Sequence, residues 1–262
     1  MPPFTGGFFI LNMIAIPNNI FMQLLAESVL KNSSEEINYV SSSLALSNLL
    51  EDRCDVAIFP SLDLLQHKEL FISGRNAISF DGYFSNQYIY FKENEKKIQE
   101  LYLRGDLSKN EIILSKILFR ENYNSDVNII IDTKSFEIGS KNYLVSGNEN
   151  FSDNLFKKGI SFCDEICDLL DAPYVNYVIA SKRRESILEI NKLFVDAENK
   201  VENYLKTSAD AKIGKALKTE LLNNFNSFYF EMTEIESDSL KEILRICYYQ
   251  GLAEELFEIN FV

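Results

Sequence analysis

The sequence predicts an α/β fold made of two lobes joined by a hinge, with a cleft between the lobes. Short apolar segments alternate with segments of helical periodicity, which is typical of sheets with parallel strands. A middle block, residues 91–180, carries its own strand–helix–strand set and interrupts a first block that resumes after it. We therefore expect lobe 1 to comprise residues 1–90 and 181–262, and lobe 2 to comprise residues 91–180. The cleft between such lobes is the default ligand site.

The first block opens with a strand–helix unit. The apolar segment 6–16 ends at Pro17, which predicts a buried strand followed by a helix over residues 18–30. A serine run at 41–43 precedes a leucine-rich segment that predicts a helix through residue 50, because serine is a preferred N-cap residue. From their β-branched and aromatic content, further strands are expected over residues 37–40, 55–60 and 69–79.

The following segments continue the alternation and then become mostly helical. Residues 174–180 are typical of a strand, which can carry the chain back out of the middle block. From residue 182 onward, apolar residues recur at helical spacing. A strand over residues 225–233 interrupts this pattern, and a helix over residues 240–250 is expected to end at Gly251. Before these, we expect strands over residues 87–92, 100–104 and 127–132 and a helix over residues 108–119.

The charge of the chain excludes some classes of partner. The 262 residues carry 26 Lys and Arg against 39 Asp and Glu, a formal net charge of -13 at pH 7. Such a charge repels polyphosphate and anionic lipid at long range, so neither nucleic acid nor a membrane surface is an expected partner. The apolar N-terminal segment has no basic start, and the 4 cysteines are too sparse for a disulfide framework. We therefore expect a cytoplasmic protein.

Metal and cofactor sites are not expected. His67, the only histidine, lies in a polar segment where a surface position is favoured over a role as general base. Cys163 and Cys167 share one helix face, but a zinc site usually needs a second pair, so core packing is favoured. The chain has 10 glycines and shows no glycine-rich phosphate loop or nucleophile elbow. Neither a cofactor nor a metal is predicted, and the oligomeric state stays open.

The segment Ser108-Lys109-Asn110-Glu111 precedes an apolar helix and has the spacing of a capping box. One interpretation is a capped helix, in which Glu111 accepts a hydrogen bond from the amide of Ser108. The other is a helix N-terminus that faces the cleft and offers its amides to an anionic ligand. In that case a ligand carboxylate meets the like charge of Glu111, which Lys109 and Arg104 would have to offset.

Two further groups of polar residues are expected where strands end at the cleft. Asn12 is placed at the end of the first strand, and residues 81–86 follow a later strand. Strand ends converge on the ligand crevice of an open α/β sheet, although Asn12 can equally serve as a turn former. Ser85 and Asn86 offer a hydroxyl and an amide to a ligand, or simply form a polar loop.

Several segments, placed in order, resemble one enzyme family over nearly the full chain. They begin with Phe9-Ile10-Leu11-Asn12 and include the strand that ends at Ser61 and the glycine turn at Gly82. They are similar to segments of the menaquinone-biosynthesis enzymes of the futalosine route, chorismate dehydratase and its sister dihydroxynaphthoate synthase, and the chain resembles a divergent member. The segments are residues 9–12, 50–61, 78–82, 88–91, 138–144 and 170–179.

This resemblance implies a type II periplasmic-binding-protein-like fold used in the cytoplasm, with a small-molecule carboxylate ligand in the inter-lobe cleft. For the dehydratase type, the implied reaction is loss of water from chorismate to give an enolpyruvyl benzoate, with Asn12 at the matching catalytic position. The alternative is a non-catalytic solute-binding or sensing protein of the same fold, because the start of the second-lobe helix keeps only the first of the family's hydroxyls. The implied substrate-binding residues are Ser61, Gly82, Ser85, Asn86, Ser108, Lys109, Asn110 and Glu111.

Overall fold

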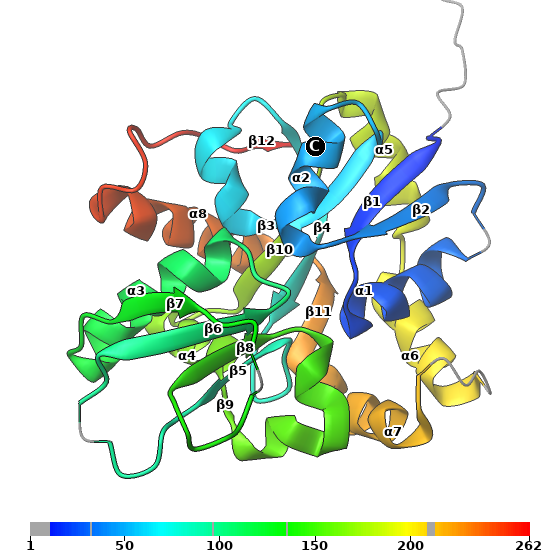
Figure 1. Cartoon of the computed structure of the whole chain (residues 1–262). Helices are drawn as coiled ribbons and strands as arrows, with labels where there is room; N and C mark the ends of the chain where they lie inside the picture. The colour runs from blue at the N-terminus through cyan, green and yellow to red at the C-terminus, as the bar shows by residue number, and fades with distance from the viewer. Residues whose placement is uncertain (1–10, 32, 96, 135, 209–212) are drawn as a thin grey trace, which may run out of the picture.

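Two β-sheets, each with helices packed against it, build the molecule (Figure 1). The computed structural model describes residues 11–262 except residues 32, 96, 135 and 209–212. The larger, seven-stranded sheet has the order β11-β4-β10-β3-β1-β2, with β12 paired to β4, and the five-stranded sheet has the order β7-β6-β8-β5-β9. The predicted α/β fold with two sheets is therefore confirmed.

The elements have the following bounds. The larger sheet contains β1 Met13–Pro17, β2 Glu36–Val40, β3 Val56–Pro60, β4 Phe71–Phe80, β10 Tyr174–Ser181, β11 Phe228–Glu231 and β12 Asn260–Phe261. The smaller sheet contains β5 Gln87–Tyr90, β6 Glu100–Gly105, β7 Asn128–Ile131, β8 Tyr143–Ser146 and β9 Ile160–Ser161. The α-helices are α1 Ile20–Leu25, α2 Ser42–Leu50, α3 Lys109–Tyr123, α4 Phe162–Leu170, α5 Arg184–Leu193, α6 Ala197–Thr207, α7 Lys215–Asn223 and α8 Glu234–Tyr249. Within the described residues, no helix is both long and apolar enough to cross a membrane.

Three parallel strands of the larger sheet determine where polar residues gather. β1 lies between β2 and β3, and all three run in the same direction. Their carboxyl ends, at Pro17, Val40 and Pro60, therefore lie at one edge of the sheet. A helix or a 3-10 turn begins within three residues of each of these ends. This edge is where an open α/β sheet places its ligand crevice.

The chain passes between the two sheets twice. β4 belongs to the larger sheet and β5 to the smaller one, and β10 returns to the larger sheet by pairing with β3 and β4. The crossings therefore lie within residues 81–86 and 171–173, ahead of the boundaries expected at residues 90 and 180. We refer to the larger sheet with its helices as lobe 1, and to the smaller sheet with α3 as lobe 2. That the lobes behave as separate domains stays a prediction.

Two helix and strand boundaries differ from the expected ones. The first strand begins at Met13 rather than near residue 6, and residues 6–10 lie outside the described residues. The last helix begins at Glu234 rather than near residue 240, because Thr233 and Glu236 form a capping box. Its expected end is confirmed, since Gly251 follows the helix with a φ of +72°.

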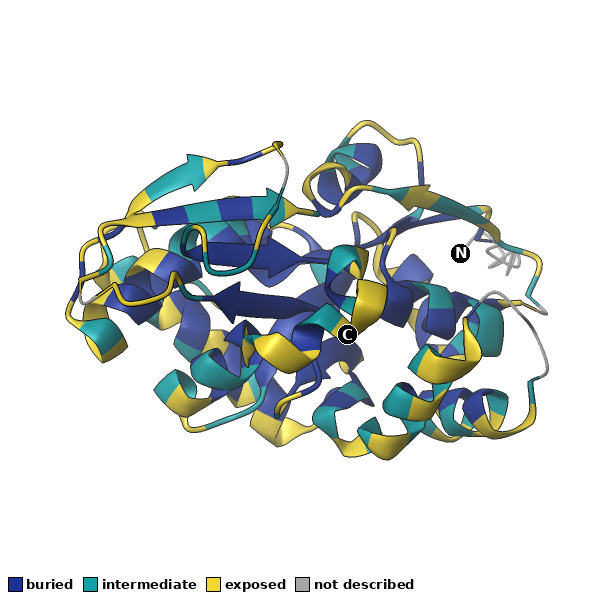
Figure 2. Cartoon of the chain, turned by 60° about the horizontal axis from the view of Figure 1, so that its bottom comes forward, coloured by how far each residue is buried: buried dark blue, intermediate teal, exposed yellow. Residues whose placement is uncertain are grey.

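Buried apolar side chains form a continuous core that runs through both lobes (Figure 2). Aromatic rings also join the lobes directly. The ring of Phe21 in α1 lies 4.9 Å from that of Phe80 and 6.2 Å from that of Phe151, which belongs to the segment after β8. The ring of Phe84, in the first crossing, lies 5.5 Å from that of Phe151. We call these ring contacts the apolar junction between the lobes.

Candidate functional site

Polar side chains follow each of the three parallel strands of lobe 1. After β1, Asn19 caps α1, and its Oδ1 accepts a hydrogen bond from the amide of Met22 at 3.1 Å. After β2, Ser42 is the first residue of α2, and after β3, Ser61 begins the 3-10 turn. All three side chains are buried. The sequence brings them together because the strands that precede them are parallel and adjacent.

A bulge in β10 directs two neighbouring polar side chains to this edge. Val175 pairs with Ser79 and Tyr177 with Ile78, so Asn176 is an extra residue in the strand. The hydroxyl of Tyr177 lies within 3.2 Å of Ser42 Oγ and accepts a hydrogen bond from Asn86 Nδ2 at 3.2 Å. In a regular strand adjacent side chains point to opposite faces, and a bulge is a common way to redirect one of them.

Asn110 connects α3 of lobe 2 to the same edge. Its Nδ2 donates to the hydroxyl of Tyr174 at 2.8 Å and to Asn176 Oδ1 at 2.9 Å. Its Oδ1 accepts from the amide of Leu62 at 3.0 Å, and Ser61 Oγ lies 3.4 Å from its Nδ2. Asn110 is fully buried, so this amide is fixed between the two lobes.

Backbone N–H groups at the N-termini of α1 and α2 donate hydrogen bonds to side-chain oxygen atoms of lobe 2. The amide of Ser42 donates to Asp106 Oδ1 at 2.8 Å, and its hydroxyl donates to Asp106 Oδ2 at 2.6 Å. The amide of Ile20 donates to Asn148 Oδ1 at 2.8 Å. Burial raises the pKa of Asp106, and the hydrogen bonds from Ser42 oppose that shift only in part. The positions where a helix start would hold a ligand anion are thus occupied by the chain itself.

The capping box at the start of α3 is confirmed. Glu111 Oε2 accepts from the amide and the hydroxyl of Ser108 at 2.6 and 2.7 Å, and its Oε1 contacts Gln87 Nε2. Glu111 is 1% exposed, and this burial raises the pKa of its carboxyl group. The interpretation as a free helix N-terminus that offers amides to an anion is wrong for this structure, because the helix caps itself.

Other sequence-predicted residues, in the first crossing and at the start of α3, make the following contacts. Ser85 is buried, and its hydroxyl lies 2.8 Å from Ser161 Oγ, while the carbonyl of Gly82 accepts from Ser161 at 3.3 Å. Both therefore stabilise the first crossing. Lys109 points elsewhere, because its Nζ pairs with Asp63 Oδ1 at 3.0 Å near the surface.

Asn12 lies at the wrong end of β1 to join the cluster. It precedes Met13, where the strand begins, and it is exposed. Its backbone N–H donates to Asp55 Oδ2 at 2.8 Å, at the amino edge of the parallel strands. Asn12 was expected at the end of the first strand, which is wrong, because the strand begins after Asn12 and runs to Pro17. Asn19 therefore occupies the place expected for Asn12. No finding tests a catalytic role for Asn12.

We name this cluster the polar seam. Two buried side-chain atoms in it have no hydrogen-bond partner among the described residues, namely Asn86 Oδ1 and Asn176 Nδ2. Sequence reasoning missed several members, although the serine run at 41–43 and the polar residues after the strand over 100–104 were visible signals. The polar seam consists of Asn19, Ser42, Ser61, Asn86, Asp106, Asn110, Asn148, Tyr174, Asn176 and Tyr177.

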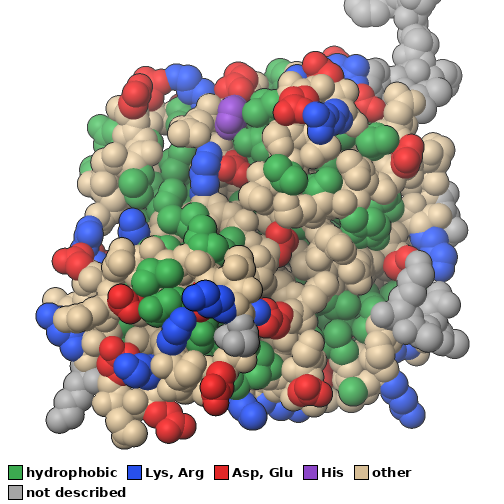
Figure 3. All heavy atoms as spheres, in the orientation of Figure 1, with side chains coloured by type: hydrophobic (Ala, Val, Ile, Leu, Met, Phe, Trp, Pro, Cys, Tyr) green, Lys and Arg blue, Asp and Glu red, His purple; other side chains and the backbone are tan. Residues whose placement is uncertain are grey.

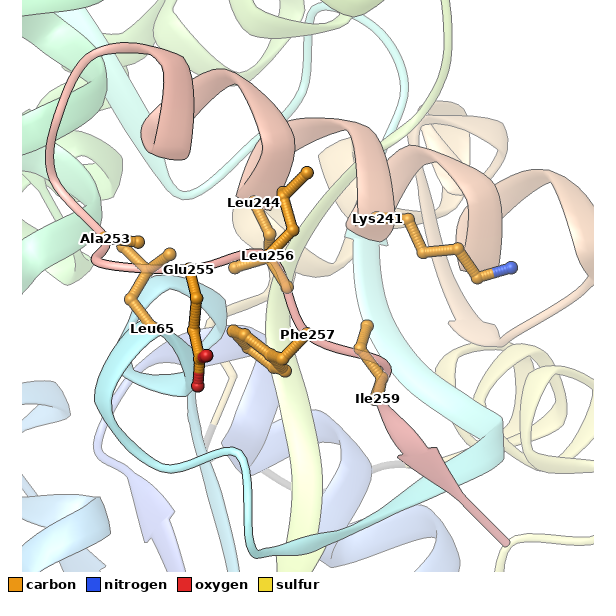
Figure 4. Close-up of a pocket in the computed structure, with 8 residues that line it drawn as sticks. All are labelled: Leu65, Lys241, Leu244, Ala253, Glu255, Leu256, Phe257 and Ile259. Carbon is orange, nitrogen blue, oxygen red and sulfur yellow. The ribbon is translucent and has the colours of Figure 1, made fainter.

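Several cavities lined by described residues lie outside the polar seam. A cavity of about 330 Å³ is lined by Asn18, Gln23, Glu27, Tyr39 and Ile213, beside α1. A pocket between the 3-10 turn after β3 and the segment after α8 has a volume of only about 40 Å³. Its apolar lining includes Leu65 and Phe257, and the amino group of Lys241 points away from it (Figure 4). The expected open cleft is closed here by direct contacts between the lobes.

The histidine and the cysteine pair singled out in the sequence have the following surroundings. His67 lies at the surface (Figure 3), and its Nδ1 is 3.3 Å from Glu69 Oε1. Cys163 and Cys167 are buried, and burial raises the pKa of Cys167 to about 12, so its thiolate is scarce at neutral pH. In the part of the chain that the structure describes, no cluster of three His, Cys, Asp or Glu side chains could hold a metal ion.

Comparisons with known proteins identify the fold. No family model matches the chain, and no curated protein matches it. The periplasmic aliphatic sulphonate-binding protein SsuA of Escherichia coli is similar in structure, with a TM-score of 0.62, 11% identity and coverage of 95% of this chain and 94% of that one. The alkanesulfonate-binding protein SsuA of Xanthomonas axonopodis pv. citri, bound to MOPS, has a TM-score of 0.58 at 9% identity, covering 96% and 97%.

A third similar structure is described by its fold rather than by a ligand. The CA3427 gene product of Candida albicans, reported to have the generic periplasmic binding protein fold, has a TM-score of 0.55 and 11% identity, covering 94% of this chain and 92% of that one. These comparisons give no support to the menaquinone-biosynthesis family in particular. They show that this chain has the two-lobed periplasmic-binding-protein fold.

Proposed function

We propose that the chain is a small-molecule-binding protein, of the solute-binding or sensing type, whose ligand binds at the polar seam between the lobes. The observation that carries this proposal is the pair of buried, unpartnered atoms, Asn86 Oδ1 and Asn176 Nδ2. Leaving a buried polar atom without a partner costs free energy, which a ligand bonded to it would recover. The shared fold supports the same location, since such lobes bind small molecules between them.

Binding at the seam requires the lobes to part. Ligand atoms would then replace contacts that now join the lobes directly, such as those of Asp106 with Ser42 and of Asn148 with Ile20. The aromatic contact between Phe21 and Phe151 opposes this opening, because parting the rings exposes apolar surface. The unliganded protein is therefore expected to be mostly closed. A cytoplasmic location is part of the proposal, and cell fractionation tests it.

The enzymatic alternative, loss of water from chorismate, has weaker support. Chorismate carries two carboxylates, and helix N-termini are the natural places to bind them. In this structure the starts of α1, α2 and α3 are bonded to Asn148, Asp106 and Glu111. A dicarboxylate that used two of these helix starts would have to displace at least one of the chain's own acidic side chains.

A thermal-shift screen of the full chain against a panel of metabolites tests the proposed function. The panel contains amino acids, amines, sulfonates, carboxylates including chorismate, and sugars. We expect one compound class to raise the unfolding midpoint by several degrees and to be recovered unchanged. Formation of enolpyruvyl benzoate from chorismate would establish the enzymatic alternative instead. A panel with no stabilising compound would contradict the proposed function.

A further inference from the structure

Asp106 of the polar seam and the nearby Glu111 have no cationic partner among the residues that the structure describes. Within the described part of the chain, the carboxylate of Asp106 receives hydrogen bonds from the amide and the hydroxyl of Ser42. Glu111, at the start of α3, receives hydrogen bonds from Ser108, Gln87 and Ser146. Among the described residues, neither acid forms an ion pair, and burial is the largest cause of the raised pKa of each.

The basic residues nearest in sequence are engaged elsewhere. Arg104 pairs with Glu149 at 2.8 Å and donates to the carbonyl of Lys134. Lys109 pairs with Asp63 at 3.0 Å and donates to Gln66. The charge of an ionised Asp106 must therefore be balanced by a proton or by a ligand. A partly buried carboxylate without a counter-charge is disfavoured, so a cationic ligand would be favoured there.

The unpartnered amide of Asn86 indicates the same class of ligand. Asn86 is fully buried, and its Nδ2 donates to the hydroxyl of Tyr177, which lies 3.2 Å from Ser42 Oγ. Ser42 in turn donates to Asp106. The free Oδ1 of Asn86 is an acceptor, so this end of the seam offers acceptors and needs N–H donors. An ammonium group supplies three donors and a positive charge.

Asn176, which contacts Asn110 and Tyr174, has the complementary need. Asn176 is 1% exposed, and its Oδ1 accepts from Asn110 and from Tyr174. Its Nδ2 is a donor without a partner. A ligand hydroxyl or carbonyl oxygen would satisfy it.

We propose that the ligand of the polar seam is a small organic amine that pairs its ammonium group with Asp106 when the lobes part. Asn86 Oδ1 accepts a further N–H bond from it, and Asn176 Nδ2 donates to a hydroxyl or carbonyl oxygen elsewhere in the ligand. Amino alcohols and amino amides have this arrangement. The inference rests on the proposed function, and it specifies the charge of the ligand.

Four probes with the same carbon chain and different head groups test this charge preference on the unmodified protein. They are n-butylamine, 1-butanol, butyrate and butanesulfonate, each added at the same millimolar concentration and ionic strength, with 4-aminobutanol as the two-ended probe. The amine is expected to raise the unfolding midpoint, and 4-aminobutanol to raise it further, to roughly 5 °C. A larger effect of butyrate or butanesulfonate overturns the inference, as do equal effects of all probes or no effect of any.

A charge-neutral variant then locates the site. Asp106→Asn should weaken amine binding at least about tenfold, measured by calorimetric titration, since a hydrogen bond to a charged group is lost. Asp126→Asn, which removes an exposed carboxylate of the same lobe, should leave the affinity unchanged. Equal weakening by both variants, or by neither, contradicts a role for Asp106. If metabolites of another charge bind in the wider screen, the proposed function stands and only the amine inference fails.

Discussion

Ser42 and Asp106 lie in different lobes and are joined by two hydrogen bonds, at 2.8 Å from the amide and 2.6 Å from the hydroxyl of Ser42. This contact places a carboxylate at the N-terminus of α2, where the helix dipole favours negative charge. Burial works against the same charge, and it is the stronger effect, because the pKa of Asp106 is raised overall. One of the contacts that join the lobes therefore involves a carboxyl group without an ion-pair partner among the described residues.

The first prediction concerns the charge of Asp106 in the unliganded protein. Asp106→Asn keeps an oxygen that can accept from the amide of Ser42 and removes the charge of this partly buried side chain. We expect the unfolding midpoint at pH 7 to rise by roughly 1–3 °C, measured by scanning calorimetry. The control Asp126→Asn, at an exposed ion pair with Arg120, should change it by less than about 1 °C. A clear decrease for Asp106→Asn would show that the carboxylate stabilises the closed form.

The second prediction concerns how the difference in unfolding midpoint between Asp106→Asn and the wild type depends on pH. Since the pKa of Asp106 is raised in the folded protein, the fold binds this proton more tightly than the unfolded chain does. Ionisation therefore opposes folding above the raised pKa, and the opposition vanishes as the pH falls below the ordinary value of 3.8. The midpoint of Asp106→Asn should exceed that of the wild type at pH 7, and the two should converge toward pH 4. A difference that grows on acidification would refute the assigned sign.

The third prediction concerns the hydroxyl of Ser42. Ser42→Ala removes the hydrogen bond to Asp106 Oδ2 and the contact with the hydroxyl of Tyr177. We expect the free energy of unfolding, from denaturant titration, to fall by about 1–3 kcal/mol, because buried polar groups lose a partner. Ser43→Ala is the matched control, since Ser43 is exposed in the same helical turn, and it should cost less than about 0.5 kcal/mol. Similar losses for both variants would argue against the seam contact.

The fourth prediction tests the apolar junction. The ring of Phe151 lies 5.5 Å from Phe84 and 6.2 Å from Phe21, so it holds lobe 2 against lobe 1. Phe151→Ala should favour partly open forms and increase the radius of gyration in small-angle scattering. The exposed Tyr249 provides the control Tyr249→Ala, for which no change is expected. An unchanged radius for Phe151→Ala would mean that the polar seam alone holds the lobes together.

The fifth prediction separates Asn86 from Asn12, two of the asparagines singled out by the sequence. Asn86 is fully buried in the polar seam, whereas Asn12 is exposed at the opposite edge of the sheet. Asn86→Ala should abolish the midpoint rise given by a binding compound, and Asn12→Ala should leave it intact, in parallel thermal-shift measurements. If Asn12→Ala removes the response instead, the ligand lies at the amino edge of the strands.

The fold could be predicted because its signals are local and repeated. The alternation of strands and helices gave the α/β class, and the capping boxes follow from four-residue patterns such as Ser108 to Glu111. The crossing after β4 was expected near residue 90 and lies within residues 81–86. The start of the last helix was missed although Thr233 and Glu236 carry the same capping pattern.

The site could be predicted only in part, because it depends on pairings between distant segments. Asn86 and Asn110 were identified from their positions, and both lie in the polar seam. Asp106 and Tyr177 were not, since their importance comes from contacts with Ser42 across 64 and 135 residues of sequence. The bulge that redirects Asn176 is likewise a property of the pairing between β10 and β4, which the strand pattern alone does not contain.

Hydrogen exchange read by mass spectrometry, with and without the strongest compound from the metabolite screen, tests most directly whether a ligand binds between the lobes. Binding at the polar seam should slow exchange together in residues 40–45 and 174–177 of lobe 1, in the crossing 84–87 and in residues 104–111 of lobe 2. Slowed exchange confined to one lobe, or to the cavity beside α1, would contradict the account.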